Sequence, residues 1–195
     1  LVTTLDAALQ ETAYDALGNR SGAVVVLEAE TGRILTMVSK PDYDPNVIGD
    51  QWDEIVEDED NSVLLNRVTS GLYPPGSVFK ILTLLEYAHE NKEYDSFRFD
   101  CEGSYSAYGE TIRCYHDYAH GSENLASAFA NSCNCAFAKI GQGLDLAKFR
   151  VTCSKLLFDT DLPVDISSYK SKFTLTAQDS EFDIMATAMG QGNTQ

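Results

Sequence analysis

The chain has 195 residues, enough for one domain of ordinary size or two small ones, and its 44% hydrophobic content is sufficient for a core. A formal net charge of −16 disfavours a nucleic-acid partner or an anionic membrane surface, because contact with phosphates needs basic patches. No run of residues approaches the roughly 18 apolar residues of a membrane-spanning helix.

The first 48 residues have the pattern of a helix followed by a hairpin. Four apolar residues recur at helical spacing before Gly18-Asn19 ends the pattern: Leu5, Leu9, Ala13 and Leu17. Two runs rich in β-branched residues then flank a turn at Glu30-Thr31-Gly32, which predicts a hairpin. The first run, 23–27, is apolar throughout, so we expect it to be buried on both faces.

An acidic connection, residues 49–65, follows the hairpin. Its stretch GDQWDEIVEDEDNS, Gly49 to Ser62, contains seven carboxylates and no basic residue. Such a run indicates a solvated loop, with a metal site as the alternative. The stretch lacks the spaced oxygen ligands and the central glycine of a calcium-binding loop, which favours the solvated loop.

Residues 66–195 are predicted to be mainly helical. A helix from Ser77 to about Asn91 has apolar residues around most of its circumference, as is typical of a buried helix. Further helices are expected at 124–131, at 135–141, at 145–158 with Asp145 as the N-cap, and just before Gly190. Helices that follow a hairpin, without a marked domain boundary, indicate an α+β fold.

The spacing of the five cysteines does not favour a zinc site. Cys133 and Cys135 form a C-x-C pair with no second pair or histidine at zinc spacing nearby. Cys101 and Cys114 flank EGSYSAYGETIR, a predicted hairpin, so they can face each other and form a disulfide or stay reduced. Cys153 fits an amphipathic pattern as a core residue.

The histidines and several tyrosines allow a functional and a structural interpretation. The three scattered histidines are interpreted as surface or core residues rather than ligands: His89, His116 and His120. Four tyrosines could line a substrate rim, although we expect them to pack on the hairpin: Tyr105, Tyr108, Tyr115 and Tyr118.

The stretch YPPGSVFK, Tyr73 to Lys80, places a serine three residues before a lysine at the start of the predicted buried helix. This spacing puts Ser77 and Lys80 on one face of the helix, one turn apart. A serine nucleophile needs an adjacent base, and a desolvated lysine can be that base because burial lowers its pKa. The alternative is that Ser77 caps the helix while Lys80 extends to water.

A second motif favours the nucleophile. The stretch ANSCNCAF supplies Ser132-x-Asn134 between two predicted helices, where a turn can aim a hydroxyl and an amide into a cleft. S-x-x-K followed by S-x-N is two thirds of the signature that penicillin-binding proteins and serine β-lactamases share.

Over essentially its whole length, the chain resembles the transpeptidase domain of class B, monofunctional penicillin-binding proteins. Besides the two motifs, several segments carry the resemblance: LVTTLDAALQ, GAVVVLEAETGRILTMVSKPDYDPN, LNRVTSGLYPPGSVFK, HGSENLASAFANSCNCAFAKIG and AMGQGNTQ. The resemblance implies the penicillin-binding and serine β-lactamase-like fold, an antiparallel sheet flanked by helices. The K-[TS]-G motif of the family, which should follow S-x-N, is absent before Gln195. We therefore expect residues 1–195 to be the N-terminal part of one transpeptidase domain, incomplete at its C-terminal side and poorly active alone.

The resemblance also implies a chemistry. Ser77 would attack a peptidoglycan stem peptide ending in D-Ala-D-Ala, and β-lactams would acylate the same residue. Lys80 would be the general base, Ser132 a proton relay and Asn134 a hydrogen-bonding partner of the substrate amide, without a metal or organic cofactor.

The expected partners are the cell-wall synthesis machinery and the missing C-terminal part of the domain. The expected location is the extracytoplasmic face of a bacterial membrane, with an anchoring N-terminal segment that is absent from this chain. The alternatives are a D,D-carboxypeptidase or β-lactamase of the same fold, and a non-enzymatic β-lactam sensor or scaffold.

Overall fold

The computed structural model describes residues 2–58 and 60–195, which divide into two compact units. One unit comprises Leu1–Leu72 and Val164–Tyr169, and the other comprises Tyr73–Pro163 and Lys170–Gln195. Among the described residues, no helix combines the length and the apolar character needed to cross a bilayer.

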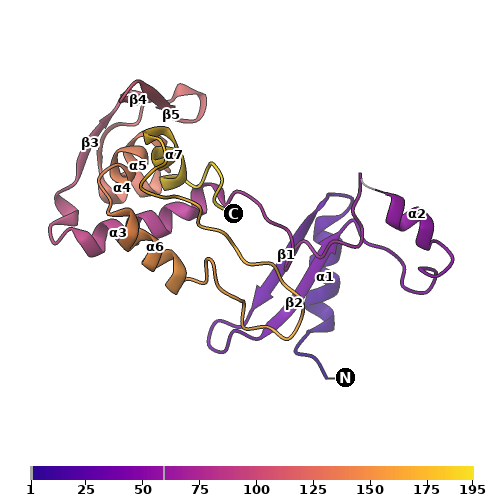
Figure 1. Cartoon of the computed structure of the whole chain (residues 1–195). Coiled ribbons are helices and arrows are strands. Elements are labelled where there is room, and N and C mark those ends of the chain that lie inside the picture. Colours follow the sequence, from indigo (N-terminus) through magenta and orange to yellow (C-terminus); the bar gives the residue numbers. More distant parts are fainter. Residues whose placement is uncertain (1, 59) are drawn as a thin grey trace. The chain divides into compact units, whose positions relative to one another are not determined.

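The first unit contains the predicted helix and hairpin (Figure 1). Helix α1, Ala7–Leu17, begins where the Asp6 carboxylate accepts a hydrogen bond from the Leu9 N–H, and it ends at Gly18. Strands β1, Gly22–Leu27, and β2, Ile34–Lys40, pair antiparallel, and α1 packs on this pair. The helix and the hairpin are therefore confirmed.

The expectation that the first apolar run is buried on both faces is wrong. Burial alternates along β1, and Val25 and Leu27 are 47% and 54% exposed. The sheet of this unit has two strands among the described residues, so α1 covers one face of β1 and leaves the other open.

The acidic connection contains a short helix that the sequence analysis did not predict, α2, Trp52–Glu57. Its first turn carries Asp53 and Glu54, whose charges are favourable at the amino end of a helix. The side chains of α2 are mostly exposed, in agreement with a solvated acidic segment. Glu59, one of the seven carboxylates of the acidic stretch, lies outside the described residues.

Helices make up most of the regular secondary structure of the second unit. Its helices are α3 Lys80–Glu90, α4 Leu125–Ala130, α5 Asn134–Gly141, α6 Leu146–Lys155 and α7 Glu181–Ala188, with 3₁₀ turns η1 Gly76–Phe79, η2 Tyr94–Ser96 and η3 Tyr115–Asp117. Asp145 caps α6 as expected, but α6 ends at Lys155 rather than at Phe158.

Two small antiparallel strand pairs complete this unit beside α5 and α7 (Figure 1). Strands β4, Ser104–Ala107, and β5, Glu110–Arg113, form the predicted hairpin. Strands β3, Arg98–Cys101, and β6, Gly121–Asn124, precede and follow this hairpin in the chain and pair with each other. This pair was not predicted. The sequence of β6, GSEN, has little strand propensity, so only the tertiary pairing makes it a strand.

The core of the second unit forms around α5. Its Phe137 and Ile140 are buried in one cluster with an aromatic group that comprises Phe79, Phe149 and Phe173. The ring of Phe79 lies 5.9 Å from that of Phe149 and 6.3 Å from that of Phe173. This packing fixes the start of α3, one residue after Phe79.

The apolar residues around α3 predicted a helix that is buried on most sides, but its burial is uneven. Ile81 and Leu85 are 47% and 41% exposed, whereas the polar residues Lys80, Thr83 and Glu86 are buried. Burial of polar groups requires partners. Thr83 donates to the Ala188 carbonyl at 2.7 Å, and Thr152 donates to the Glu86 carboxylate.

Candidate active site

The serine of S-x-x-K lies on the 3₁₀ turn that precedes α3. Gly76 has a φ of 63°, a left-handed conformation that glycine adopts without strain, and its N–H donates to the Gly190 carbonyl at 2.8 Å. Phe79 is 1% exposed and anchors the turn in the core, while Ser77 is exposed. The turn therefore presents the Ser77 hydroxyl to solvent from a rigid support.

The lysine of S-x-x-K is buried, with 1% of its surface exposed, and lies within reach of Ser77. The distance from Lys80 Nζ to Ser77 Oγ is 3.3 Å. Nζ also lies 2.9 Å from Ser132 Oγ, 2.8 Å from the Ser132 carbonyl oxygen and 2.7 Å from Asn134 Oδ1. The four predicted residues thus meet at one nitrogen atom.

The S-x-N turn connects α4 to α5 and has an unusual backbone. Ser132 has a φ of 51°, a left-handed value that costs a non-glycine residue on the order of 1 kcal/mol. The Ser132 N–H donates to the Phe129 carbonyl, and the Cys133 N–H donates to the Ala128 carbonyl. Both oxygens of Ser132 face Lys80 in this conformation.

The hydrogen bonds around Lys80 suit a neutral amine. The Ser132 carbonyl and Asn134 Oδ1 can only accept, so they take the two N–H groups of a neutral amine. The lone pair is then available to accept the proton of a hydroxyl. Burial lowers the pKa of Lys80 from 10.5 to about 8, although the electrostatic effect of the nearby cysteines, chiefly Cys133, opposes the shift.

Ser77, Ser132 and Asn134 line a pocket of about 520 Å³. Its lining comprises Ser77, Tyr115, Tyr118, His120, Asn131, Ser132, Asn134, Met189 and Gln191. Two of the four tyrosines considered as a substrate rim, Tyr115 and Tyr118, are therefore at the pocket. Tyr105 instead donates to Gln142 and packs on Phe99.

The side-chain amide of Asn134 makes hydrogen bonds through both its oxygen and its nitrogen. Its Oδ1 accepts from Lys80, and its Nδ2 donates to the Arg113 carbonyl at 3.0 Å. This second bond ties the S-x-N turn to the end of β5 and fixes which end of the amide faces the lysine.

Gly190 supports the turn that carries Ser77 by close backbone contact. A Cβ at this position would lie 1.8 Å from the Gly76 carbonyl oxygen, and the φ of Gly190 is 82°. Gly192 is a matched control, because its φ is 84° but its nearest neighbour would be 3.6 Å away. We expect Gly190→Ala to lower the free energy of unfolding by about 1–3 kcal/mol more than Gly192→Ala, as measured by denaturant titration. Equal losses in the two variants would refute a supporting role for this contact.

The sulfur atoms of four cysteines lie close together next to the S-x-N turn. The sequence patterns did not predict this cluster. Cys101 and Cys114 flank the β4–β5 hairpin as expected, but both are free, with 3.7 Å between the two sulfur atoms, so no disulfide joins them. Cys114 Sγ also lies 3.8 Å from Cys133 Sγ and 3.4 Å from Cys135 Sγ. Cys153 is buried elsewhere in the core, as predicted.

One of the three histidines, the half-buried His120, lies beside this cluster. The Nδ1 atom of His120 lies 3.5 Å from Cys101 Sγ. The ligand atoms of Cys101, Cys114, His120 and Cys133 all lie within 4.8 Å of one another, an arrangement that could hold a metal ion. No spacing rule for zinc motifs finds this group, since its members come from four separate segments.

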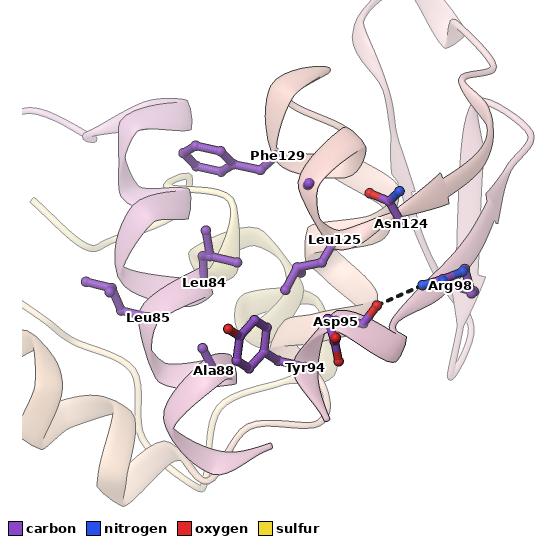
Figure 2. A pocket seen from close by; sticks show the side chains of 10 residues that line it. Leu84, Leu85, Ala88, Tyr94, Asp95, Arg98, Asn124, Leu125 and Phe129 are labelled. Carbon is purple, nitrogen blue, oxygen red and sulfur yellow. Dashed lines mark hydrogen bonds between the residues drawn. The ribbon is translucent and has the colours of Figure 1, made fainter. Parts of the chain in front are cut away.

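A different pocket, of about 640 Å³, lies elsewhere in the described residues (Figure 2). Its apolar side chains come from α3 and α4, and Arg98 donates to the Asp95 carbonyl at its edge. It shares no lining residue with the Ser77 pocket. Its lining contains no serine, cysteine, histidine or lysine, the side chains that most often supply nucleophiles and bases.

Comparison with known proteins shows which family the chain belongs to. A family model described as the penicillin binding protein transpeptidase domain matches residues 22–195. The chain belongs to this family.

Members of the transpeptidase family are similar to the chain in sequence and in structure. Peptidoglycan D,D-transpeptidase PbpA of Mycolicibacterium smegmatis is 34% identical over 178 residues, which cover 83% of this chain and 36% of PbpA. Penicillin-binding protein A from M. tuberculosis, solved as a penicillin G acyl-enzyme complex, has a TM-score of 0.85 and 27% identity, covering 98% of this chain and 48% of that one.

A third similar structure is the complex between PBP2 and MreC from Helicobacter pylori. It has a TM-score of 0.86 and 28% identity, and it covers 97% of this chain and 38% of that one. These likenesses confirm the predicted fold. The chain spans about a third of the length of the curated relatives it matches.

Proposed function

We propose that this transpeptidase-family chain acts in a serine D,D-transpeptidase that cross-links peptidoglycan stem peptides ending in D-Ala-D-Ala. The observation that carries the proposal is the convergence of Ser77, Ser132 and Asn134 on the buried Lys80 amine. The acyl-enzyme structure of a similar protein supports it.

In the first step, Ser77 Oγ attacks the carbonyl carbon of the penultimate D-alanine. Lys80 Nζ accepts the hydroxyl proton as the bond to carbon forms. Lys80 also contacts Ser132 Oγ at 2.9 Å, so the proton can pass through this hydroxyl to the amine of the departing D-alanine. The products are an acyl ester on Ser77 and free D-alanine.

In the second step, an amine of a neighbouring stem peptide attacks the ester and displaces Ser77. The amine loses its proton to the base, and the serine regains one. Asn134 is proposed to hydrogen-bond the substrate amide in both steps, because its position beside Lys80 places it at the pocket. A β-lactam would acylate Ser77 through the same first step.

The proposed substrate determines the location and the partners. Peptidoglycan lies outside the bacterial cell membrane, so we place the protein at the extracytoplasmic face. The complex of a similar PBP2 with MreC supports an association with the cell-wall synthesis machinery.

An exchange assay with the intact protein tests the function. A peptide ending in D-Ala-D-Ala is incubated with the protein and a labelled D-amino acid as the acceptor amine. We expect release of D-alanine together with incorporation of the label. Release of D-alanine without incorporation of the label would indicate a carboxypeptidase. Sustained hydrolysis of nitrocefin would indicate a β-lactamase. Labelling by penicillin without release of D-alanine would indicate a sensor.

A further inference from the structure

The S-x-N turn ends α4 in a backbone shape that glycine usually provides. The Ser132 N–H donates to the Phe129 carbonyl at 3.0 Å, and the Cys133 N–H donates to the Ala128 carbonyl at 2.9 Å, which are the two hydrogen bonds of a Schellman motif. The left-handed position of this motif is most often a glycine, but here it is Ser132, with a φ of 51°. Contacts outside the turn must therefore hold Ser132 in this conformation.

One such contact comes from a buried glutamate of β6. Glu123 pairs with Phe99 of β3 and is 1% exposed. Within the described part of the chain it forms no ion pair with a lysine, an arginine or a histidine. Its Oε1 accepts a hydrogen bond of 2.8 Å from Asn131 Nδ2. Because burial of a charge without an ion partner costs free energy, an apolar side chain would be at least as stable here, and the carboxylate needs another explanation.

Two consecutive residues of β6 hold the two ends of α4. Asn124 is the N-cap of this helix, and its side chain accepts from the Ser127 N–H at 2.8 Å. Glu123 binds the side chain of Asn131, the C-cap residue. Helix α4 has only six residues, and so short a helix depends on tertiary contacts for its stability. The place where α4 ends and the S-x-N turn begins is thus fixed by β6.

The hydrogen bond between Glu123 and Asn131 lies one residue away from the atoms that contact the base. Asn131 lines the Ser77 pocket and directly precedes Ser132. The carbonyl oxygen and the Oγ of Ser132 lie 2.8 and 2.9 Å from Lys80 Nζ. A rotation of the turn would therefore displace both an acceptor of the lysine amine and the hydroxyl that relays the proton. Because a carboxylate can only accept, it keeps the nitrogen of the Asn131 amide directed at β6.

We propose that Glu123 is a positioning residue for acyl transfer. Through its hydrogen bond to Asn131, the carboxylate holds the S-x-N turn in the left-handed conformation that directs Ser132 at Lys80. Glu123 does not line the pocket and takes no part in the transfer of the acyl group. The hydrogen bond is a feature of the fold, whereas its effect on acylation rests on the proposed function.

The first test compares the acylation rate with the stability of Glu123→Leu in the intact protein. Stopped-flow acylation over a range of penicillin concentrations should show a maximal rate lowered by roughly 10- to 100-fold, the cost of a displacement on the order of 1 Å. The thermal unfolding midpoint should not fall, because an apolar side chain replaces a buried charge. A merely structural role would lower the midpoint and the rate together. Glu123→Gln keeps an acceptor for the Asn131 amide and should stay within about threefold of the wild-type rate.

The second test breaks the same hydrogen bond from its other end. Asn131→Ala changes an exposed residue, so the fold should be retained, and acylation should slow by the same factor as in Glu123→Leu. The double variant should be no slower than either single variant, because both act through one bond. Glu110→Leu, the same change at an exposed glutamate of β5, should keep the wild-type rate.

Acylation of Glu123→Leu at the wild-type rate, or losses that multiply in the double variant, would overturn the positioning role and leave the proposed function intact. Absence of acylation at Ser77 in the wild type would instead refute the proposed function, and the positioning role with it.

Discussion

Replacement of Lys80 by methionine is expected to slow penicillin acylation of the intact protein by about 10³-fold, within the range attributed to a general base. Methionine retains the length and the apolar stem of lysine, so the burial of this position is preserved, but it cannot accept the proton of Ser77. Stopped-flow acylation by a fluorescent penicillin measures the loss. Lys139→Met, which alters an exposed lysine of α5, should leave the rate unchanged.

The pH dependence of acylation distinguishes a base from a structural cation. Because burial lowers the pKa of Lys80 to about 8, the acylation rate should rise about tenfold per pH unit below pH 8 and level off above it. Lys80→Arg keeps the positive charge at all these pH values and should be as slow as Lys80→Met. An arginine variant with substantial acylation would contradict the assignment of Lys80 as the base.

The lowered pKa of Lys80 also predicts how the stability of the folded chain changes with pH. The unfolded chain binds a proton at Lys80 up to pH 10.5, whereas the folded chain releases it near pH 8. The contribution of Lys80 to the free energy of unfolding should therefore increase as the pH rises from 8 toward 10.5. Denaturant titrations of the wild type and of Lys80→Met at several pH values measure the difference.

Local patterns predicted the ends of two helices and one hairpin. The cap at Asp145, the glycine end of α1 and the hairpin between Cys101 and Cys114 follow from a few neighbouring residues, and the structure contains all three. The S-x-N stretch forms the predicted turn, whereas the helix predicted from Ser77 begins as the 3₁₀ turn η1 and becomes α-helical at Lys80.

Features that depend on tertiary contacts were predicted less well. The burial of Lys80 was expected from an apolar helix, yet α3 exposes Ile81 and Leu85. Lys80 is buried because the S-x-N turn and the Phe137 ring, 5.6 Å from Nζ, cover it. The pairing of β3 with β6 and the cluster of Cys101 with His120 join segments far apart in the chain, and no local spacing predicts them.

The central claim is that Ser77 is the nucleophile, and its removal should have the largest effect of all. Ser77→Ala leaves no hydroxyl on the turn beside Lys80, so covalent labelling by penicillin should be abolished rather than slowed. Because Ser77 is exposed, the substitution should not change the thermal unfolding midpoint appreciably. Ser122→Ala, a change at an exposed serine of β6, should be labelled like the wild type.

Peptide mapping by mass spectrometry after incubation of the intact protein with penicillin G tests this claim most directly. We predict one penicilloyl group per chain, on the peptide that contains Ser77, and none in Ser77→Ala. A penicilloyl group on another residue, or labelling that persists in Ser77→Ala, would contradict the account.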